Sequence, residues 1–195
     1  MSKIFVDQVD PKTGTSLTLG TSGDTVNIPS GVTIANAGTA TGFGEVNTPA
    51  FSVQLGNNQS QSVSDNVITK VQLDDEYFDT DSAFDTSTYR FTVPSGKAGK
   101  YFFSWGIYLY QATVSNLQNT EALLYLNGSR YIGANFIFQN SYARYHTHGS
   151  QAFLNLSVGD YIEIFGTVNS VNGAGSPEFF GGDRATFLTG FRVTT

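Results

Sequence analysis

The two histidines of the chain have the spacing that comes closest to a site for chemistry. His146 and His148 are separated by one residue, and residues two apart point to the same side of an extended strand. Around a threefold axis, three such pairs would present six imidazoles, a number that suits an octahedral transition-metal ion. One dipeptide spacing also arises by chance, so the first interpretation is a surface pair in ordinary polar contacts, and a shared metal site at His146 and His148 is the alternative hypothesis.

A run of carboxylates forms a second candidate site for a cation. Such a cluster can bind calcium, but the twelve-residue loop with a central glycine and a final glutamate is missing here. Asp85 is placed to form a turn before the next strand, and the other carboxylates would then solvate an exposed loop. We predict no obligatory cofactor, with calcium here or a transition metal at the histidines as alternatives. The run comprises Asp74, Asp75, Glu76, Asp79, Asp81 and Asp85.

Signatures of enzymatic chemistry are absent from the sequence. No carboxylate pair lies in a recognisable glycosidase frame, and neither histidine has the surroundings of a catalytic triad. The pair Gly181-Gly182 does not open a helix that would hold a phosphate. We predict that the protein is not an enzyme, and a polysaccharide-degrading activity is the least favoured reading.

Tyrosine and arginine gather in one polar segment and indicate a contact surface. These residue types give a large, partly polar contact area at modest entropic cost. Tyr131 follows a predicted hairpin and is assigned to an oligomer core instead. The predicted contact surface consists of Arg130, Tyr142, Arg144 and Tyr145.

The segment from Tyr89 to Tyr110 reads as two strands joined at a corner that contains Pro94 and Gly96. Alternate residues from Tyr101 to Leu109 form an apolar face, and the opposite face is also rich in rings. A strand with rings on both faces indicates that another subunit covers one of them. The residues predicted to pack between subunits are Tyr101, Phe103, Trp105, Tyr108 and Tyr110.

Several segments of the chain together resemble the C1q-like domains. The segments are Ala50–Leu55, Phe91–Pro94, Lys100–Trp105, Ala152–Leu156, Gly159–Ile164 and Phe187–Phe191. They occur in the order of that family and cover the chain from about residue 50 to its end. The resemblance implies a ten-stranded jelly roll of the tumour-necrosis-factor type, assembled as a homotrimer and used for binding rather than catalysis.

The remaining patterns agree with an all-β jelly-roll sandwich. Asn127-Gly128 lies between two apolar runs, which is the signal of a hairpin with a type I′ turn. No segment shows sustained helical periodicity with caps, so we expect almost no helix.

The first 49 residues differ in composition from the remainder. They contain two aromatic residues, Phe5 and Phe43, and their apolar residues come in short pairs separated by turn signals at 22–24 and 29–31. Such a segment has too little apolar surface to fold alone, so we predict short strands that borrow a partner's core. The predicted domains are an attachment or stalk segment at 1–34, a linker at 35–49 and a trimeric head at 50–195. The predicted anchor residues are Ile4, Phe5, Val6, Leu17, Leu19, Val26 and Ile28.

The net charge limits the classes of binding partner, and the lack of cysteine excludes disulfides. The net charge is −6 with 13% charged residues, so nucleic acid and anionic membranes are disfavoured. There is no cysteine to form a disulfide. The N-terminus lacks the apolar core of a signal peptide, and no apolar run approaches the ~20 residues of a membrane span.

The segment from Ser16 to Ile34 resembles leader segments of bacteriophage tail-fibre and other virion proteins. Together with a C1q-like head, this leads to the prediction of a virion protein on the particle exterior. It would display a trimeric head that attaches to host-surface glycan or protein, from either the tail or the capsid. The alternative is a capsid decoration or cement protein that binds no ligand.

Overall fold

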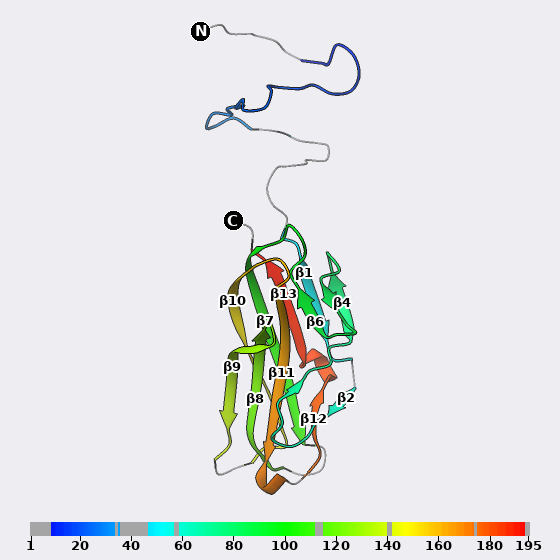
Figure 1. Ribbon diagram of the computed structural model, residues 1–195, viewed down its shortest axis with the longest axis vertical. Helices are drawn as coiled ribbons and strands as arrows, with labels where there is room; N and C mark the ends of the chain where they lie inside the picture. The colour runs from blue at the N-terminus through cyan, green and yellow to red at the C-terminus, as the bar shows by residue number, and fades with distance from the viewer. Residues whose placement is uncertain are drawn as a thin grey trace. The chain divides into compact units, whose positions relative to one another are not determined.

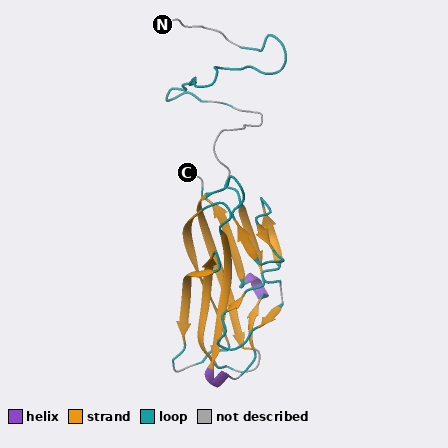
Figure 2. Ribbon diagram, viewed as in Figure 1, coloured by secondary structure: helices purple, strands orange, loops and turns teal. Residues whose placement is uncertain are grey.

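The computed structural model describes residues 9–33, 35, 47–56, 59–111, 115–139, 142–173 and 175–193. The chain divides into two units, Met1–Phe43 and Gly44–Thr195. In the first unit, residues 9–33 form neither strand nor helix (Figure 2). The amide of Asp24 donates to the Thr21 carbonyl at 3.0 Å and that of Val32 to the Pro29 carbonyl at 3.2 Å. These hydrogen bonds confirm the two predicted turns.

The larger apolar side chains of this first unit are exposed. Leu17 is 47% exposed, Leu19 65%, Val26 56% and Ile28 44%. The short strands predicted for these pairs are not formed within the single chain, because a strand needs a neighbour for its backbone groups and the described segment has none. Ile4, Phe5 and Val6 of the predicted anchor lie outside the described residues.

The second unit consists of two antiparallel sheets (Figure 1). The first, sheet A, has the order β2 (Ser60–Ser62), β12 (Pro177–Phe180), β7 (Gly99–Gln111), β13 (Phe187–Arg192), β1 (Ala50–Gln54) and β4 (Asp75–Asp79), and β10 (Tyr145–Leu156) pairs with β7. The second, sheet B, has the order β5 (Phe84–Asp85), β6 (Arg90–Thr92), β11 (Tyr161–Ser170), β8 (Leu117–Leu126) and β9 (Ser129–Ile137), and β3 (Thr69–Lys70) pairs with β11.

Helix is confined to two short 3₁₀ turns within the described part of the chain, η1 (Val171–Gly173) and η2 (Gly182–Arg184). The prediction of an all-β domain with almost no helix is confirmed. Neither turn is long and apolar enough to cross a membrane. Asn127 and Gly128 both have positive φ values, 51° and 76°, between β8 and β9, so the predicted hairpin is confirmed as well.

The core lies between the two sheets, and β7 supplies much of it. Its alternate residues from Tyr101 to Leu109 are at most 1% exposed. The ring of Phe91 on sheet B lies 5.5 Å from that of Phe103, which links the two layers. The assignment of Tyr101, Phe103 and Trp105 to contacts between subunits was therefore wrong, because these rings are buried inside their own chain.

Strands β9 and β10 are edge strands of opposite sheets and lie on the same side of the sandwich (Figure 1). The ring of Phe136 on β9 is centred 4.4 Å from that of His146 on β10. The two edges are therefore in contact through the His146 ring.

Candidate functional site: an aromatic sheet face

Sheet B packs against one face of sheet A in the described residues, and rings on the other, outer face stay partly exposed. Alternation along β7 points Phe102, Tyr108 and Tyr110 outward, because Tyr101, Phe103 and Trp105 point into the core. Neighbouring strands add further rings at matching register. We call this surface the aromatic face; it consists of Phe102, Phe153, Phe191, Tyr108, Tyr110, Tyr145 and Phe180.

One end of the aromatic face is a cluster of three phenylalanines. Phe102 on β7 lies 5.0 Å from Phe153 on β10 and 5.5 Å from Phe191 on β13, measured between ring centroids. Phe153 is 70% exposed and Phe191 is 38% exposed. Contiguous exposed rings of this kind mark interaction surfaces in soluble proteins.

The other end is centred on Tyr108. Its ring lies 5.5 Å from Phe180 and 5.8 Å from Tyr145, and burial raises the pKa of its hydroxyl. Arg144 donates from Nη2 to the Tyr110 hydroxyl at 2.9 Å, and its guanidinium lies 5.4 Å from the ring centroid. This end combines apolar area with polar groups at its margin, as contact surfaces commonly do.

The structure divides the predicted contact surface. Arg144 and Tyr145 join the rings of Tyr108 and Tyr110 on the aromatic face. Arg130 belongs instead to sheet B, where its Nη2 lies 3.3 Å from Glu121 Oε1. Tyr142 is 41% exposed in the segment that precedes β10.

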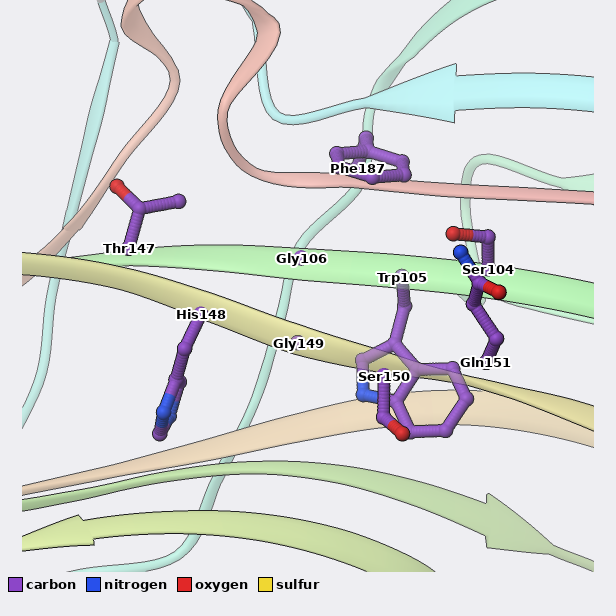
Figure 3. Close-up of a pocket in the computed structure, with 9 residues that line it drawn as sticks. All are labelled: Ser104, Trp105, Gly106, Thr147, His148, Gly149, Ser150, Gln151 and Phe187. Atoms are coloured by element: carbon purple, nitrogen blue, oxygen red, sulfur yellow. The ribbon is translucent and has the colours of Figure 1, made fainter.

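A groove of about 460 Å³ separates the two ring clusters. Gly149 on β10 is paired with Gly106 on β7, and a Cβ at Gly149 would stand only 1.8 Å from the Trp105 carbonyl oxygen. Figure 3 shows Thr147 and Phe187 on one side of the strand pair and His148 on the other. Sequence reasoning missed this groove, because it depends on two glycines from distant segments meeting in register.

The two histidines lie on the core-facing side of β10, opposite to the aromatic face. Their rings are centred 4.8 Å apart, and neither Nε2 atom has a hydrogen-bond partner within the described residues. Burial lowers the pKa of His146. Burial and the neighbouring His146 lower the pKa of His148 to about 4, against a smaller opposing effect of Glu121. Both imidazoles are therefore neutral at pH 7.

The part of the chain that the structure describes contains no group of three or more His, Asp or Glu side chains that could hold a metal ion. A transition-metal site at His146 and His148 would need ligands from other subunits, and it stays a prediction. Among the predicted calcium ligands, Asp79 accepts the amide of Phe84 at 2.7 Å and Asp81 lies 3.3 Å from Lys97 Nζ. Calcium binding by this run also stays a prediction.

Asp85 makes the turn that its position indicated. It accepts the amide of Ser87 at 2.8 Å and the hydroxyl of Thr88 at 2.8 Å. Hydrogen bonds from Ser87, followed by those from Thr88, lower the pKa of its carboxyl to about 2. The carboxylate thus serves the local turn.

No protein-family model and no curated protein matches the chain. Solved structures do resemble it. The globular domain of zebrafish complement 1qA is 20% identical, with a TM-score of 0.50 over 75% of this chain and 98% of that chain. Eiger TNF from S. frugiperda is 13% identical, with a TM-score of 0.51 over 74% of this chain and 91% of that chain. Murine APRIL is 13% identical, with a TM-score of 0.51 over 74% of this chain and 99% of that chain. The second unit therefore has the C1q/TNF-like jelly-roll fold that the sequence predicted.

Proposed function

We propose that this protein is a non-enzymatic homotrimer whose heads pack through the aromatic face, and that it is a fibre-type protein on the exterior of a virion. The trimer would present three identical heads for attachment to a host surface. The observation that carries the proposal is the aromatic face itself, an uncovered sheet surface with Phe153 70% exposed at its edge. The likeness in fold to C1q and TNF-family domains supports it.

A second copy of the chain is the occupant that best fits the aromatic face. Each aromatic side chain can bury about 150–250 Å². Half coverage of the seven rings would bury about 525–875 Å², a range that includes the roughly 800 Å² per partner of a standard interface. The face includes the edge strand β10, so the neighbour's edge strands can approach it and close a ring of three. Burying one large apolar side chain stabilises such an assembly by about 1.5–3 kcal/mol.

The leader supports attachment of the trimer to another protein. Leu19 and Val26 are 65% and 56% exposed within a segment that forms no strand of its own. Such side chains gain stability only when a partner covers them. We assign that partner to the virion, because the leader resembles those of bacteriophage virion proteins. Three heads on one anchored trimer would then hold a surface through several weak contacts at high effective concentration.

The oligomeric state is the direct test. Sedimentation at micromolar concentration is expected to give a mass three times that of the 21.0 kDa chain. Phe153→Arg places a charge in the phenylalanine cluster and is expected to give monomers. Val67→Arg changes a side chain that is 49% exposed in a loop outside this face and should leave the trimer intact. A monomeric wild-type protein would refute the proposal.

The attachment role is tested on particles. Purified trimer added in excess is expected to slow adsorption of virions to their host, because it occupies the same receptors. Electron microscopy of labelled particles then distinguishes a few copies at the tail from many over the capsid. Unchanged adsorption, with the protein present on the capsid, would instead support the decoration or cement function.

A further inference from the structure

A second pair of hollows lies at the other edge of sheet A, where β1, β4 and η2 meet. Their volumes are about 280 Å³ and 550 Å³, and both are lined by Gln54 and Arg184. We call this region the β4 shelf. It consists of Ser52, Gln54, Asp75, Tyr77, Asp183 and Arg184.

Tyr77 reaches the β4 shelf because the edge strand is bulged. Ser52 pairs with Phe78, whereas the next residue, Val53, pairs with Glu76, so Tyr77 is the extra residue of a β-bulge. The bulge leaves its ring 66% exposed, with the ring of Phe78 at 6.1 Å in an edge-on arrangement. Bulges of this kind re-aim a side chain and are frequent beside functional sites.

A second local irregularity points at the same place. Asp183 and Arg184 have φ values of 55° and 56°, and they are the only consecutive non-glycine residues with positive φ in the described chain. A residue with a Cβ is strained at positive φ, and strained residues of this kind cluster at functional sites. The conformation directs the Arg184 guanidinium over the Tyr77 ring, with Cζ 4.6 Å from its centroid.

Hydrogen bonds hold some polar groups of the β4 shelf in place, but part of their hydrogen-bonding capacity is left for a ligand. Gln54 is only 8% exposed, and its Nε2 donates to Asp75 Oδ2 at 2.5 Å. Asp75 makes no further side-chain hydrogen bond to a described residue. Arg184 has no described carboxylate within 4.0 Å, although Asp75 and Asp183 line the same hollow. The shelf thus holds two carboxylates, one guanidinium and the exposed Tyr77 ring, which has that guanidinium over one of its faces.

We propose that the β4 shelf binds a neutral saccharide. Carboxylates accept hydrogen bonds from neighbouring sugar hydroxyls, a guanidinium donates to ring and hydroxyl oxygens, and an aromatic face attracts the C–H groups of a pyranose. Two carboxylates against one guanidinium repel an anionic sugar. As a receptor contact this inference rests on the proposed attachment function, whereas saccharide binding itself belongs to the isolated protein.

The proposed trimer leaves the β4 shelf accessible. Between β10 and β4, sheet A contains β7, β13 and β1 in that order. At about 4.8 Å between neighbouring strands, the shelf lies roughly 20 Å across the sheet from β10. Phe187 on β13 lines both the groove of the aromatic face and one hollow of the shelf, so the neighbouring subunit must sit on the rings of β10 and β7 rather than over β13 for the three shelves to stay open for multivalent binding.

Saturation-transfer NMR on the full-length protein tests this site. The probes are methyl α-D-mannoside, methyl α-D-glucoside, methyl β-D-galactoside and N-acetylglucosamine, each at about 10 mM because a single shallow site binds in the millimolar range. Glycerol and N-acetylneuraminic acid serve as acyclic and anionic comparators. At least one neutral sugar is expected to receive saturation well above both comparators.

Variants assign the signal to the β4 shelf. Tyr77→Ala and Arg184→Gly are expected to reduce the transfer at least fivefold, and glycine suits the positive φ of Arg184. Tyr77→Phe should retain it, because the ring is kept. Tyr131→Ala is the matched control: Tyr131 is also an exposed residue at a β-bulge, on β9 of sheet B, and should leave the signal unchanged.

Several outcomes would overturn the inference. They are no transfer to any neutral sugar above glycerol, stronger transfer to N-acetylneuraminic acid, or full transfer in folded Tyr77→Ala. If the trimer blocks adsorption but binds none of the sugars, the inference fails and the proposed function stands. If a sugar binds at the shelf while adsorption is unaffected, the attachment function fails and the saccharide site stands.

Discussion

Gly149 lies where β10 approaches β7 so closely that a methyl group has no room. A Cβ there would stand 1.8 Å from the Trp105 carbonyl oxygen, which belongs to backbone and cannot rotate away. Gly149→Ala is therefore expected to separate the two strands locally and to lower the free energy of unfolding by at least about 2 kcal/mol. Urea denaturation of the purified protein measures this change.

The neighbouring exposed residue gives the control for this substitution. Gln151→Ala changes a side chain on the same strand that points to the same face, and its cost should stay within about 0.5 kcal/mol. Equal stability of Gly149→Ala and wild type would contradict the close approach of the two strands.

Acid should destabilise the fold through His148, which lies on β10 beside the His146 ring. Burial lowers the pKa of this imidazole from 6.5 to about 4, so the folded state favours its neutral form. The resulting stability is present above pH 6.5 and is lost as pH falls from 6.5 toward 4. Because the ring is only half-buried, solvent screening reduces the loss to roughly 1–2 kcal/mol. Unfolding midpoints in urea between pH 7.5 and 4.5 report it.

His148→Leu isolates this contribution from the carboxylates that titrate in the same range. The variant keeps an apolar side chain beside the His146 ring, and its stability should fall less steeply with acid than that of wild type. Identical pH dependence of the two proteins would show that His148 is not held neutral by its surroundings.

At the scale of elements, alternation along β7 correctly divided its residues into two faces. It did not show which face packs in the core of the single chain. Both faces carry rings, and burial between sheets and burial between subunits require the same side chains. Tyr101, Phe103 and Trp105 were assigned to the wrong kind of burial for this reason. The opposite face, with Tyr108 and Tyr110, is the one left uncovered in the single chain.

The β4 shelf could not be predicted from the sequence, for a different physical reason. Asp75 was recognised only as a member of an acidic run, and nothing in the sequence marked Tyr77 or Arg184. The bulge at Tyr77 depends on the register between β1 and β4, and the positive φ of Arg184 is unfavourable for its own side chain. Tertiary packing imposes both features, so local propensity gives no signal of them.

The leader can be tested as an element by deletion. Its described apolar side chains are exposed, so they contribute little to the folding of the head. Removing residues 1–45 should leave the thermal unfolding midpoint of the head within about 2 °C, because the described leader side chains bury little apolar surface. The same deletion should abolish incorporation into particles, which immunoblotting of purified virions measures. Incorporation of the truncated protein would contradict the assignment of an anchor.

At the scale of the whole molecule, the two units present apolar surface of different kinds. The head carries a cluster of rings on one sheet face, and the described part of the leader carries separate exposed Leu, Val and Ile side chains without strand or helix. A large rigid face suits a copy of itself, because symmetry places identical surfaces at matching geometry. A ring-poor segment without strands of its own suits a preformed groove on a different protein, which would supply the neighbours that its backbone and apolar side chains need.

Assembly through the aromatic face makes thermal stability depend on protein concentration. If three chains unfold together, mass action favours the folded trimer as concentration rises. A head of about 150 residues has an unfolding enthalpy of roughly 100 kcal/mol per chain near 60 °C, or about 300 kcal/mol per trimer. A tenfold increase in concentration should then raise the unfolding midpoint by about 3 °C, measured by calorimetry with reversible unfolding confirmed by rescanning. Phe153→Arg, expected to be monomeric, should show a midpoint that is independent of concentration. If the unfolding midpoint of the wild type does not change with concentration, the chains unfold singly, and the aromatic face does not form an interface between subunits.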